Sequence, residues 1–154
     1  MDRIDRAILA ILQDDASIPV ADIAESVGLS ATPCWRRIQR LEADGYIVKR
    51  VALLSADKLN VGVTVFVSMK TSQHNREWFE RFKAVVLNIP EVVEFYRLSG
   101  QTDYLLRVVV SDIAGYDAVY QELIRNTQLF DVSSSFAMET IKLTTALPLG
   151  HIAE

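Results

Sequence analysis

The fold of this chain is constrained most by the order in which its strand-like and helix-like patterns of apolar residues follow each other. Between residues 61 and 141, stretches that alternate apolar and polar side chains are interleaved with stretches of helical spacing. The pattern predicts strands over 61–69, 92–98, 104–110 and 132–141, and helices over 78–86 and 113–124. The order is βαββαβ, two βαβ halves of similar length, which predicts a ferredoxin-like arrangement.

The predicted sheet has an apolar second face. Helices cover only one face of such a sheet, so the other face of a monomer should be polar. Here it is not, because whichever set of strand residues faces the helices, the other set still includes large apolar side chains, such as Phe66, Phe95, Leu105 and Val109. A half-apolar face predicts a partner, most simply a second copy stacked sheet to sheet. Arg107 interrupts that face and requires a nearby carboxylate such as that of Glu94.

The first fifty residues follow another pattern, three short helices and then a strand. Asp2 can cap the first helix, with Asp5 in its first turn, and the apolar face of this helix consists of Ile4, Ile8, Ile11 and Leu12. The later boundaries are marked by Pro19 near the start of the second helix, Gly28 in a left-handed turn, Ser30 as the cap of the third helix and Gly45 after its end. Residues 46–53 alternate like a strand, so the segment predicts a winged helix-turn-helix.

The third helix carries a block of positive charge. Cys34, Ile38 and Leu41 fall at i, i+4 and i+7 and should be buried, which leaves an outward set of Trp35, Arg36, Arg37, Gln39 and Arg40. Outward arginines can hold phosphate or pair with guanine in a major groove, and Trp35 can pack on a sugar or a thymine methyl group. Two alternatives stay open: the basic face is merely solvated, or Trp35 packs into the core or a subunit contact. The spacing of Cys34 favours a small core side chain over a redox switch.

The charge balance limits how tightly one such helix can bind DNA. The chain has a formal net charge of -4, and residues 1–50 contain seven basic and eight acidic side chains, a net charge of -1. The positive charge is local, on Arg36, Arg37, Arg40, Lys49 and Arg50. We therefore expect one site to bind DNA weakly and several sites on an oligomer to bind it well.

The segment 99–104 joins the two halves of the second pattern as a hairpin. Gly100 permits a positive φ, and Asp103 can accept hydrogen bonds from turn amides. The hairpin is either a plain connection or a small-ligand site, in which backbone N–H groups receive a carboxylate and Asp103 receives an ammonium group. Ser133, Ser134 and Ser135 can add hydroxyl groups to such a site.

Several classes of protein find no support in the sequence. The charged start is unlike a secretory signal, and charges interrupt every apolar run, so we expect no membrane segment. One cysteine cannot form an intrachain disulfide, which fits a reducing, cytoplasmic setting. His74, His151 and Cys34 form no metal-ligand or nucleophile motif, so we expect no catalytic residue, metal or cofactor. These absences argue against the competing hypothesis of an enzyme built on a dimeric ferredoxin-like barrel.

With both halves placed, the chain resembles the Lrp/AsnC family of transcriptional regulators, also called feast/famine regulators, nearly end to end. The residues that carry the resemblance are 4–9, 27–30 and 37–45 (RIQRLEADG) in the first half, and 99–106 and 141–148 in the second. The version Thr32-Pro33-Cys34-Trp35 looks like that of the DecR-like subgroup.

The resemblance implies an N-terminal winged helix that binds DNA and a C-terminal βαββαβ (RAM) domain that dimerises through stacked sheets. Dimers of this family assemble further, often to octamers. A free amino acid binds between dimers, near the loop that contains Gly100 and Asp103, and changes assembly or DNA affinity. The recognition-helix positions of the family match Ser30, Thr32, Trp35, Arg36, Arg37 and Arg40.

The sequence thus predicts an α+β chain with a DNA-binding domain over 1–50, a linker over 51–60, a ferredoxin-like domain over 61–148 and a tail over 149–154. We expect a transcriptional regulator whose partners are double-stranded DNA, further copies of itself and an amino-acid effector. Expected DNA contacts are Ser30, Thr32, Trp35, Arg36, Arg37, Arg40, Lys49 and Arg50. Expected effector contacts are Gly100, Thr102, Asp103, Ser133 and Ser135. The alternative is an amino-acid sensor that acts through protein partners without DNA.

Overall fold

The computed structural model describes residues 1–73, 75–125 and 131–152. By its internal contacts the chain divides into two units. The N-terminal unit contains residues 1–53 and the C-terminal segment from Lys142 onward, and the sheet unit contains residues 54–141.

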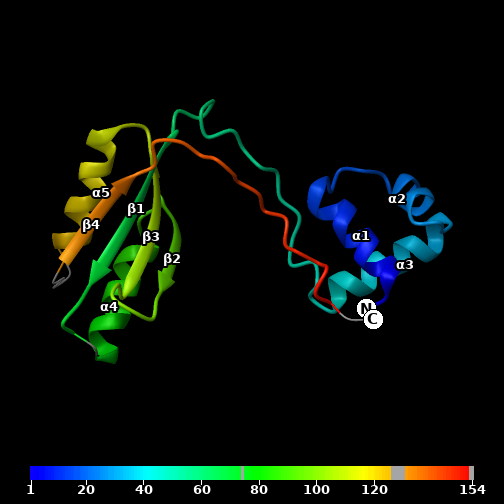
Figure 1. Ribbon diagram of the computed structural model, residues 1–154, viewed down its shortest axis with the longest axis horizontal. Coiled ribbons are helices and arrows are strands. Elements are labelled where there is room, and N and C mark those ends of the chain that lie inside the picture. The colour runs from blue at the N-terminus through cyan, green and yellow to red at the C-terminus, as the bar shows by residue number, and fades with distance from the viewer. Residues whose placement is uncertain (74, 126–130, 153–154) are drawn as a thin grey trace. The chain divides into compact units, whose positions relative to one another are not determined.

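Three helices build the N-terminal unit: α1 (Arg3–Asp14), α2 (Val20–Ser26) and α3 (Ala31–Ala43). Their apolar faces meet in one core, formed by Ile8, Leu12, Ile23, Ala24, Cys34, Ile38 and Leu41. Cys34, Ile38 and Leu41 are at most 1% exposed, so the spacing of the third helix predicted its inner face correctly. The helix-turn-helix is therefore fixed by packing of α3 against α1 and α2 (Figure 1).

The ends of these helices follow local chemistry. Asp2 and Asp5 form a reciprocal capping box, in which each carboxylate accepts the backbone N–H of the other. Gly28 and Gly45 have φ of 72° and 78°, the left-handed backbone in which glycine ends α2 and α3. Ser30 occupies the N-cap of α3 as predicted, but its side chain makes no cap hydrogen bond within the described chain.

The strand expected over residues 46–53 does not form. The N–H groups of Tyr46 and Ile47 both donate to the carbonyl of Leu41, which closes the end of α3, and residues 48–53 have no regular structure. A strand needs a second strand to satisfy its backbone groups, and the described residues offer none here. The alternation of residues 46–53 therefore predicted a strand that the structure does not have.

The segment beyond Ile141 belongs to the N-terminal unit, whereas the expected boundary kept it with the sheet up to residue 148. The side-chain amide of Gln13 donates to the carbonyl of Leu147 at 3.1 Å, and its oxygen accepts the N–H of Leu147 at 3.0 Å. Arg6 donates to the carbonyl of Ile152 at 2.7 Å. These bonds tie the C-terminal segment to α1.

The sheet unit has the predicted order of elements. They are β1 (Val63–Lys70), α4 (Arg76–Leu87), β2 (Val92–Arg97), β3 (Tyr104–Val110), α5 (Ile113–Arg125) and β4 (Asp131–Phe136). The strands lie in the order β2-β3-β1-β4, and each neighbouring pair is antiparallel. Both helices pack on one face of the sheet, where Val65, Val67, Leu106 and Val108 meet Phe82 of α4 and Leu123 of α5 (Figure 1).

The last strand is shorter than expected. It ends at Phe136 instead of residue 141, because its pairing with β1 ends at the pair of Val65 and Phe136. The final bond across the pair joins the N–H of Ala137 to the carbonyl of Thr64 at 2.9 Å. Beyond it the chain has no strand partner in the described sheet, and Met138 and Ile141 are exposed.

The second face of the sheet carries no helix and is partly apolar, as predicted. Phe66 is 39% exposed, and Leu105 and Val109 are half-buried. Arg107 pairs with Glu94 at 2.7 Å, which confirms the predicted partner. Phe95 was placed on the wrong face: its ring meets the edge of Phe82 on the helix side, at a centroid distance of 5.5 Å. A bulge between Val92 and Glu94 inserts one residue and reverses the facing of every later side chain of β2.

Candidate nucleic-acid interface and effector site

The outward face of α3 is built by residues that lie opposite its buried stripe. Thr32, Arg36 and Gln39 repeat at i, i+4 and i+7, and all three are exposed. Trp35 is 52% exposed, so within this unit it is not a core side chain. Ser30 is exposed at the start of the same helix. The face therefore offers a hydroxyl group, an indole, a guanidinium and an amide to a groove.

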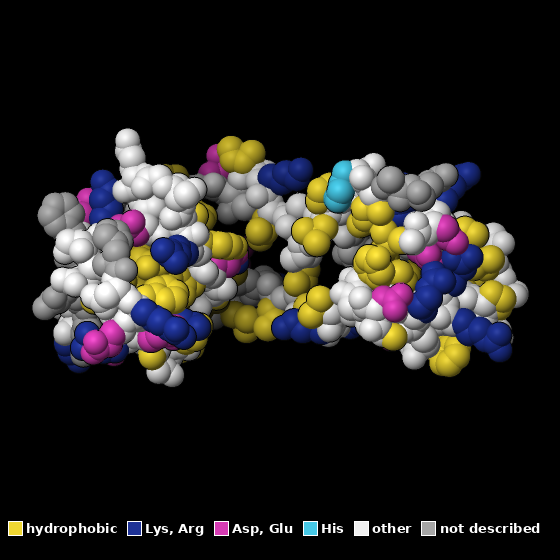
Figure 2. Space-filling view, turned by 90° about the horizontal axis from the view of Figure 1, so that it is seen from below, with side chains coloured by type: hydrophobic (Ala, Val, Ile, Leu, Met, Phe, Trp, Pro, Cys, Tyr) yellow, Lys and Arg dark blue, Asp and Glu magenta, His cyan; other side chains and the backbone are white. Residues whose placement is uncertain are grey.

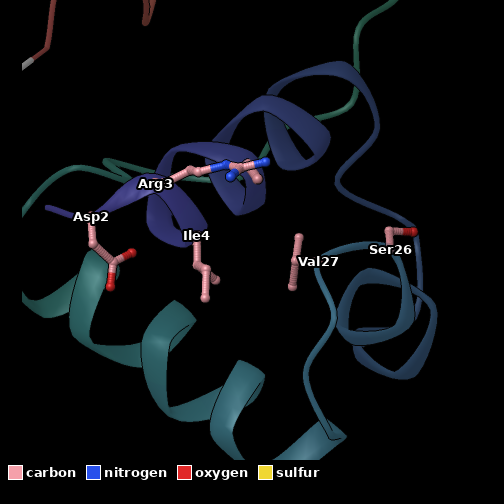
Figure 3. Close-up of a pocket in the computed structure, with 6 residues that line it drawn as sticks. Asp2, Arg3, Ile4, Ser26 and Val27 are labelled. Carbon is pink, nitrogen blue, oxygen red and sulfur yellow. The ribbon is translucent and has the colours of Figure 1, made fainter. Parts of the chain in front are cut away.

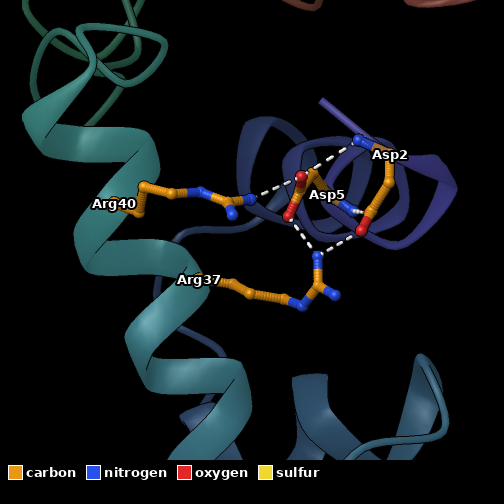
Figure 4. Close-up of polar contacts among 4 residues, drawn as sticks. All are labelled: Asp2, Asp5, Arg37 and Arg40. Atoms are coloured by element: carbon orange, nitrogen blue, oxygen red, sulfur yellow. Dashed lines mark hydrogen bonds and ion pairs between the residues drawn. The ribbon is translucent and has the colours of Figure 1, made fainter. Parts of the chain in front are cut away.

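Arg37 does not belong to that face. Its Nη1 contacts Asp2 Oδ2 at 2.6 Å and Asp5 Oδ1 at 2.8 Å, and its side chain is 26% exposed (Figure 4). Arg40 Nη2 contacts the other oxygen of Asp5 at 2.6 Å, and its side chain is 52% exposed. The expectation that Arg37 faces fully outward is therefore wrong, because its guanidinium is held against α1. Its expected contact with DNA stays a prediction, and Arg40 lies between α1 and solvent.

The four side chains form what we call the Asp–Arg cluster: Asp2, Asp5, Arg37 and Arg40. Asp5 is 1% exposed, and its carboxylate also accepts the N–H of Asp2 at 3.0 Å. The backbone N–H of Asp5, followed by the Arg37 guanidinium, lowers the pKa of Asp2 to about 2. In turn the carboxylates of Asp2 and Asp5 raise the pKa of Arg37. The charges of Asp2 and Arg37 are thus stabilised by their neighbours in the cluster.

Helical spacing contains a signal for this cluster that the sequence analysis missed. Asp5 lies three residues before Ile8 and seven before Leu12, so it shares the buried face of α1. Arg37 lies three residues after Cys34 and four before Leu41, so it borders the buried face of α3. The two helices pack against each other, and both residues lie on or beside the faces that meet. Their spacing therefore predicts a buried ion pair between the carboxylate and the guanidinium.

The remaining basic residues are exposed. Arg50 contacts Glu42 at 2.8 Å, and its side chain is 43% exposed, whereas Lys49 is exposed and forms no ion pair with the described acidic residues. In the view of Figure 2, basic side chains lie beside acidic ones on the surface of each unit. The positive potential available to DNA is therefore modest for one chain.

An open hollow of about 560 Å³ lies next to the Asp–Arg cluster. It is lined by residues of α1 and of the end of α2, namely Asp2, Arg3, Ile4, Ala7, Ser26 and Val27 (Figure 3). A second hollow, of about 540 Å³, lies between α4 and α5 of the sheet unit, next to Val85 and Ala118. Neither contains a predicted effector residue.

The hairpin between β2 and β3 has the positive φ predicted at Gly100, but the Asp103 carboxylate accepts from Thr71, after β1, instead of from a turn amide. Gly100 has a φ of 125°, where a side chain is disfavoured, and Thr102 and Asp103 are half-buried. The N–H of Asp103 donates to the carbonyl of Met69 at 3.0 Å, and Asp103 Oδ2 accepts the N–H of Thr71 at 2.9 Å. Asp103 thus ties the hairpin to the end of β1 and uses one carboxylate oxygen to do so.

The serines of β4 divide between the two faces of the sheet. Ser133 and Ser135 pair with Ser68 and Phe66, lie on the face without helices and are exposed. Ser134 points the other way and hydrogen-bonds Tyr116 of α5. Ser133 stands two strands away from the start of β3, a separation of about 10 Å. Within one chain these serines and the hairpin do not form one pocket, so their role as effector contacts stays a prediction.

Other residues considered in the sequence have local roles. Cys34 is buried in the N-terminal core, and burial raises the pKa of its thiol. His74 lies outside the described residues, and His151 is exposed. The described part of the chain contains no group of three or more metal-ligating side chains. It also contains no helix long and apolar enough to cross a membrane.

Comparison with known proteins places both units in one family of regulators. Residues 1–48 match the winged helix-turn-helix DNA-binding family, and residues 64–147 match the Lrp/AsnC ligand binding domain. The two matches follow each other in the order that the sequence predicted.

Whole-chain relatives have the same architecture. The chain is 49% identical over 150 residues to the DNA-binding transcriptional activator DecR of Escherichia coli strain K12, which is 97% of this chain and 99% of DecR. It is 61% identical to the AsnC family transcriptional regulator from Agrobacterium tumefaciens, whose structure superposes with a TM-score of 0.95 over 99% of this chain and 100% of that chain. A transcriptional regulator from Neisseria meningitidis, solved as a complex with L-Met, is 35% identical, with a TM-score of 0.93 over 98% of both chains.

These likenesses confirm the resemblance seen in the sequence and favour DNA binding over a sensor that acts only through protein partners. The matched regions cover both units, and the relatives are similar over nearly their whole length. The chain belongs to the Lrp/AsnC family and is a DNA-binding transcriptional regulator of that type.

Proposed function

We propose that this regulator responds to a free amino acid, which binds between dimers at the hairpin that contains Gly100, Thr102 and Asp103. The observation that carries the proposal is the likeness to the Neisseria meningitidis regulator solved with L-Met, which extends over 98% of both chains. The free N–H groups of a glycine hairpin suit a carboxylate, and the second oxygen of Asp103 suits an ammonium group. Ser133 and Ser135 are the hydroxyl groups that a neighbouring copy can add.

We further propose that the sheet face without helices joins two copies, and that dimers assemble to octamers. A half-apolar face with Phe66, Leu105 and Val109 supports the first step. An effector that binds one assembly better than another shifts the population toward it, by as much as its affinities differ. The free energy of effector binding is thereby linked to how many α3 helices one assembly presents to DNA.

The proposed contacts with DNA are the exposed residues of α3 and the segment after it. Ser30, Thr32, Trp35 and Arg36 face outward, Arg40 is shared with Asp5, and Lys49 and Arg50 follow. We propose no cofactor besides the effector, and we place the regulator in the cytoplasm because its target is DNA.

Thermal unfolding in the presence of each of the twenty amino acids tests the effector. A ligand that binds the folded state raises the midpoint by an amount that grows with its concentration above Kd. Asp103→Asn is the matched variant, because an amide oxygen can still accept from Thr71 while the negative charge is lost. We expect wild type to respond to at least one amino acid and the variant to keep its midpoint without ligand but lose the response.

Two results would contradict the proposal. If the wild type responds to none of the amino acids, the proposal of an amino-acid effector is wrong. If Asp103→Asn responds as the wild type does, the assignment of the binding site to this hairpin is wrong.

A further inference from the structure

The buried carboxylate of Asp5 has a role in the structure that capping α1 does not require. A capping box needs one oxygen of Asp5 for the N–H of Asp2. Yet both oxygens also contact arginines of α3, Oδ1 with Arg37 and Oδ2 with Arg40. One carboxylate of α1 thus holds two side chains of the helix that faces DNA.

The two arginines are held differently. Arg37 makes both of its ion pairs through Nη1, with a side chain that is 26% exposed, so it is part of the contact between α1 and α3. Arg40 is 52% exposed and contacts Asp5 through Nη2. A guanidinium has five N–H donors in a rigid plane, so holding one nitrogen narrows the range of directions in which the others can point.

We propose that Asp5 is a positioning residue for DNA recognition: it pins α3 to α1 through Arg37 and sets the angle at which Arg40 presents its remaining N–H donors to DNA. Arg37 itself is then a positioning residue and not a DNA contact. The proposal rests on α3 being the recognition helix, and it names the residue that orients it.

Positioning differs from simple stabilisation in what it changes. Loss of a stabilising contact lowers the unfolding midpoint but leaves a folded protein that reads DNA normally. Loss of a positioning contact lets the folded helix and its arginine adopt several orientations, which weakens base recognition, whereas attraction to phosphate depends on charge and tolerates such freedom. The ratio of affinities for specific and non-specific DNA separates the two roles.

Asp5→Asn in the full chain is the main variant, because asparagine can still accept the N–H of Asp2 but carries no charge for the arginines. The probes are a duplex enriched by the wild-type protein from a randomised pool and a scrambled duplex of the same composition. Titrations are run well below the unfolding midpoint of each variant. We expect the affinity ratio to fall by about tenfold, the loss of one good base contact, with binding to the scrambled duplex at least as tight as in wild type.

Arg40→Lys is the second variant, which tests the proposal even where Asp5→Asn does not fold. It keeps the charge of a half-exposed residue but replaces the planar fork by a single point of attachment. We expect the same fall in the affinity ratio and an unchanged dependence of scrambled-duplex binding on salt. A folded Asp5→Asn or Arg40→Lys protein with the wild-type affinity ratio would overturn the proposal.

Arg36→Gln distinguishes failure of this proposal from failure of the interface. Arg36 is exposed on the outward face, and its loss should weaken binding to both duplexes and reduce the log–log salt slope by about 0.9 for each lost phosphate contact. An unchanged slope in Arg36→Gln would contradict the assignment of α3 as the DNA-facing helix, whatever the result for Asp5.

Discussion

At the scale of the residue, the position of a side chain around its helix decides its role more than its charge does. Arg36 and Arg37 are neighbours of the same type, yet Arg36 is exposed and Arg37 is ion-paired to α1. One residue turns a helix by about 100°, which carries the second arginine from the outer face to the border of the core. A block of basic residues therefore overstates the charge that a helix offers to DNA.

The pKa of Asp2 gives a prediction for acid stability. Its folded-state pKa is about 2 and its ordinary value is 3.8, so the carboxylate stabilises the fold fully above pH 4 and loses that effect as pH falls toward 2. We expect Asp2→Asn to lower the urea midpoint most above pH 4, with a difference from wild type that shrinks toward pH 2. The measurement is urea unfolding at low salt, since Asp2 is exposed and salt weakens its ion pair. A difference independent of pH would contradict the assignment.

Burial of Cys34 gives a second prediction at this scale. Its thiol is inaccessible in the N-terminal core, and burial raises its pKa, so little thiolate forms near neutral pH. We expect a thiol reagent to react at least about a hundredfold more slowly with the folded chain than with the chain in urea, at a rate set by opening of the unit. Equal rates in the two states would show that the cysteine is exposed.

At the scale of the element, periodicity predicted the order of helices and strands. The errors arose where a neighbouring strand or helix determines the length of an element or the direction of its side chains. All three N-terminal helices and the βαββαβ order follow from side-chain spacing, because each element buries one face. The length of β4 depends on how far its pairing with β1 extends, and the facing of Phe95 depends on one bulge. Neither is encoded in the element itself. The contact between Asp5 and Arg37 was missed for the same reason, since it joins two helices that the analysis treated separately.

The pair of Glu94 and Arg107 allows a test of the sheet face as an interface. The two side chains are 36% and 27% exposed in the single chain, and a stacked sheet would bury them further. Glu94→Gln leaves a guanidinium unpaired in that interface, so we expect the dimer to dissociate at least about tenfold more readily, measured by sedimentation equilibrium. The double variant Glu94→Gln with Arg107→Met removes both charges and should restore dimerisation. If Glu94→Gln dimerises as tightly as the wild type, the sheet face without helices is not the dimer interface.

At the scale of the whole molecule, the charge balance is the reason why the proposed assembly would matter for DNA binding. The chain carries a net charge of -4, and the Asp–Arg cluster engages two of the three arginines of α3. One recognition helix therefore has little charge with which to attract phosphate. Joining several helices on the proposed assembly would raise the affinity by a factor of about 10² to 10⁴ without any new contact.

The most direct test of this account is DNA binding by a chain that cannot pair its sheets. Phe66 lies in the middle of β1, on the face without helices, and is 39% exposed, so Phe66→Glu should leave the fold intact and place a charge in the interface. We predict a folded monomer by circular dichroism and sedimentation, with DNA affinity lower by about a hundredfold and a shallower salt slope. A folded monomer that binds DNA with the affinity and salt slope of the wild type would contradict the account.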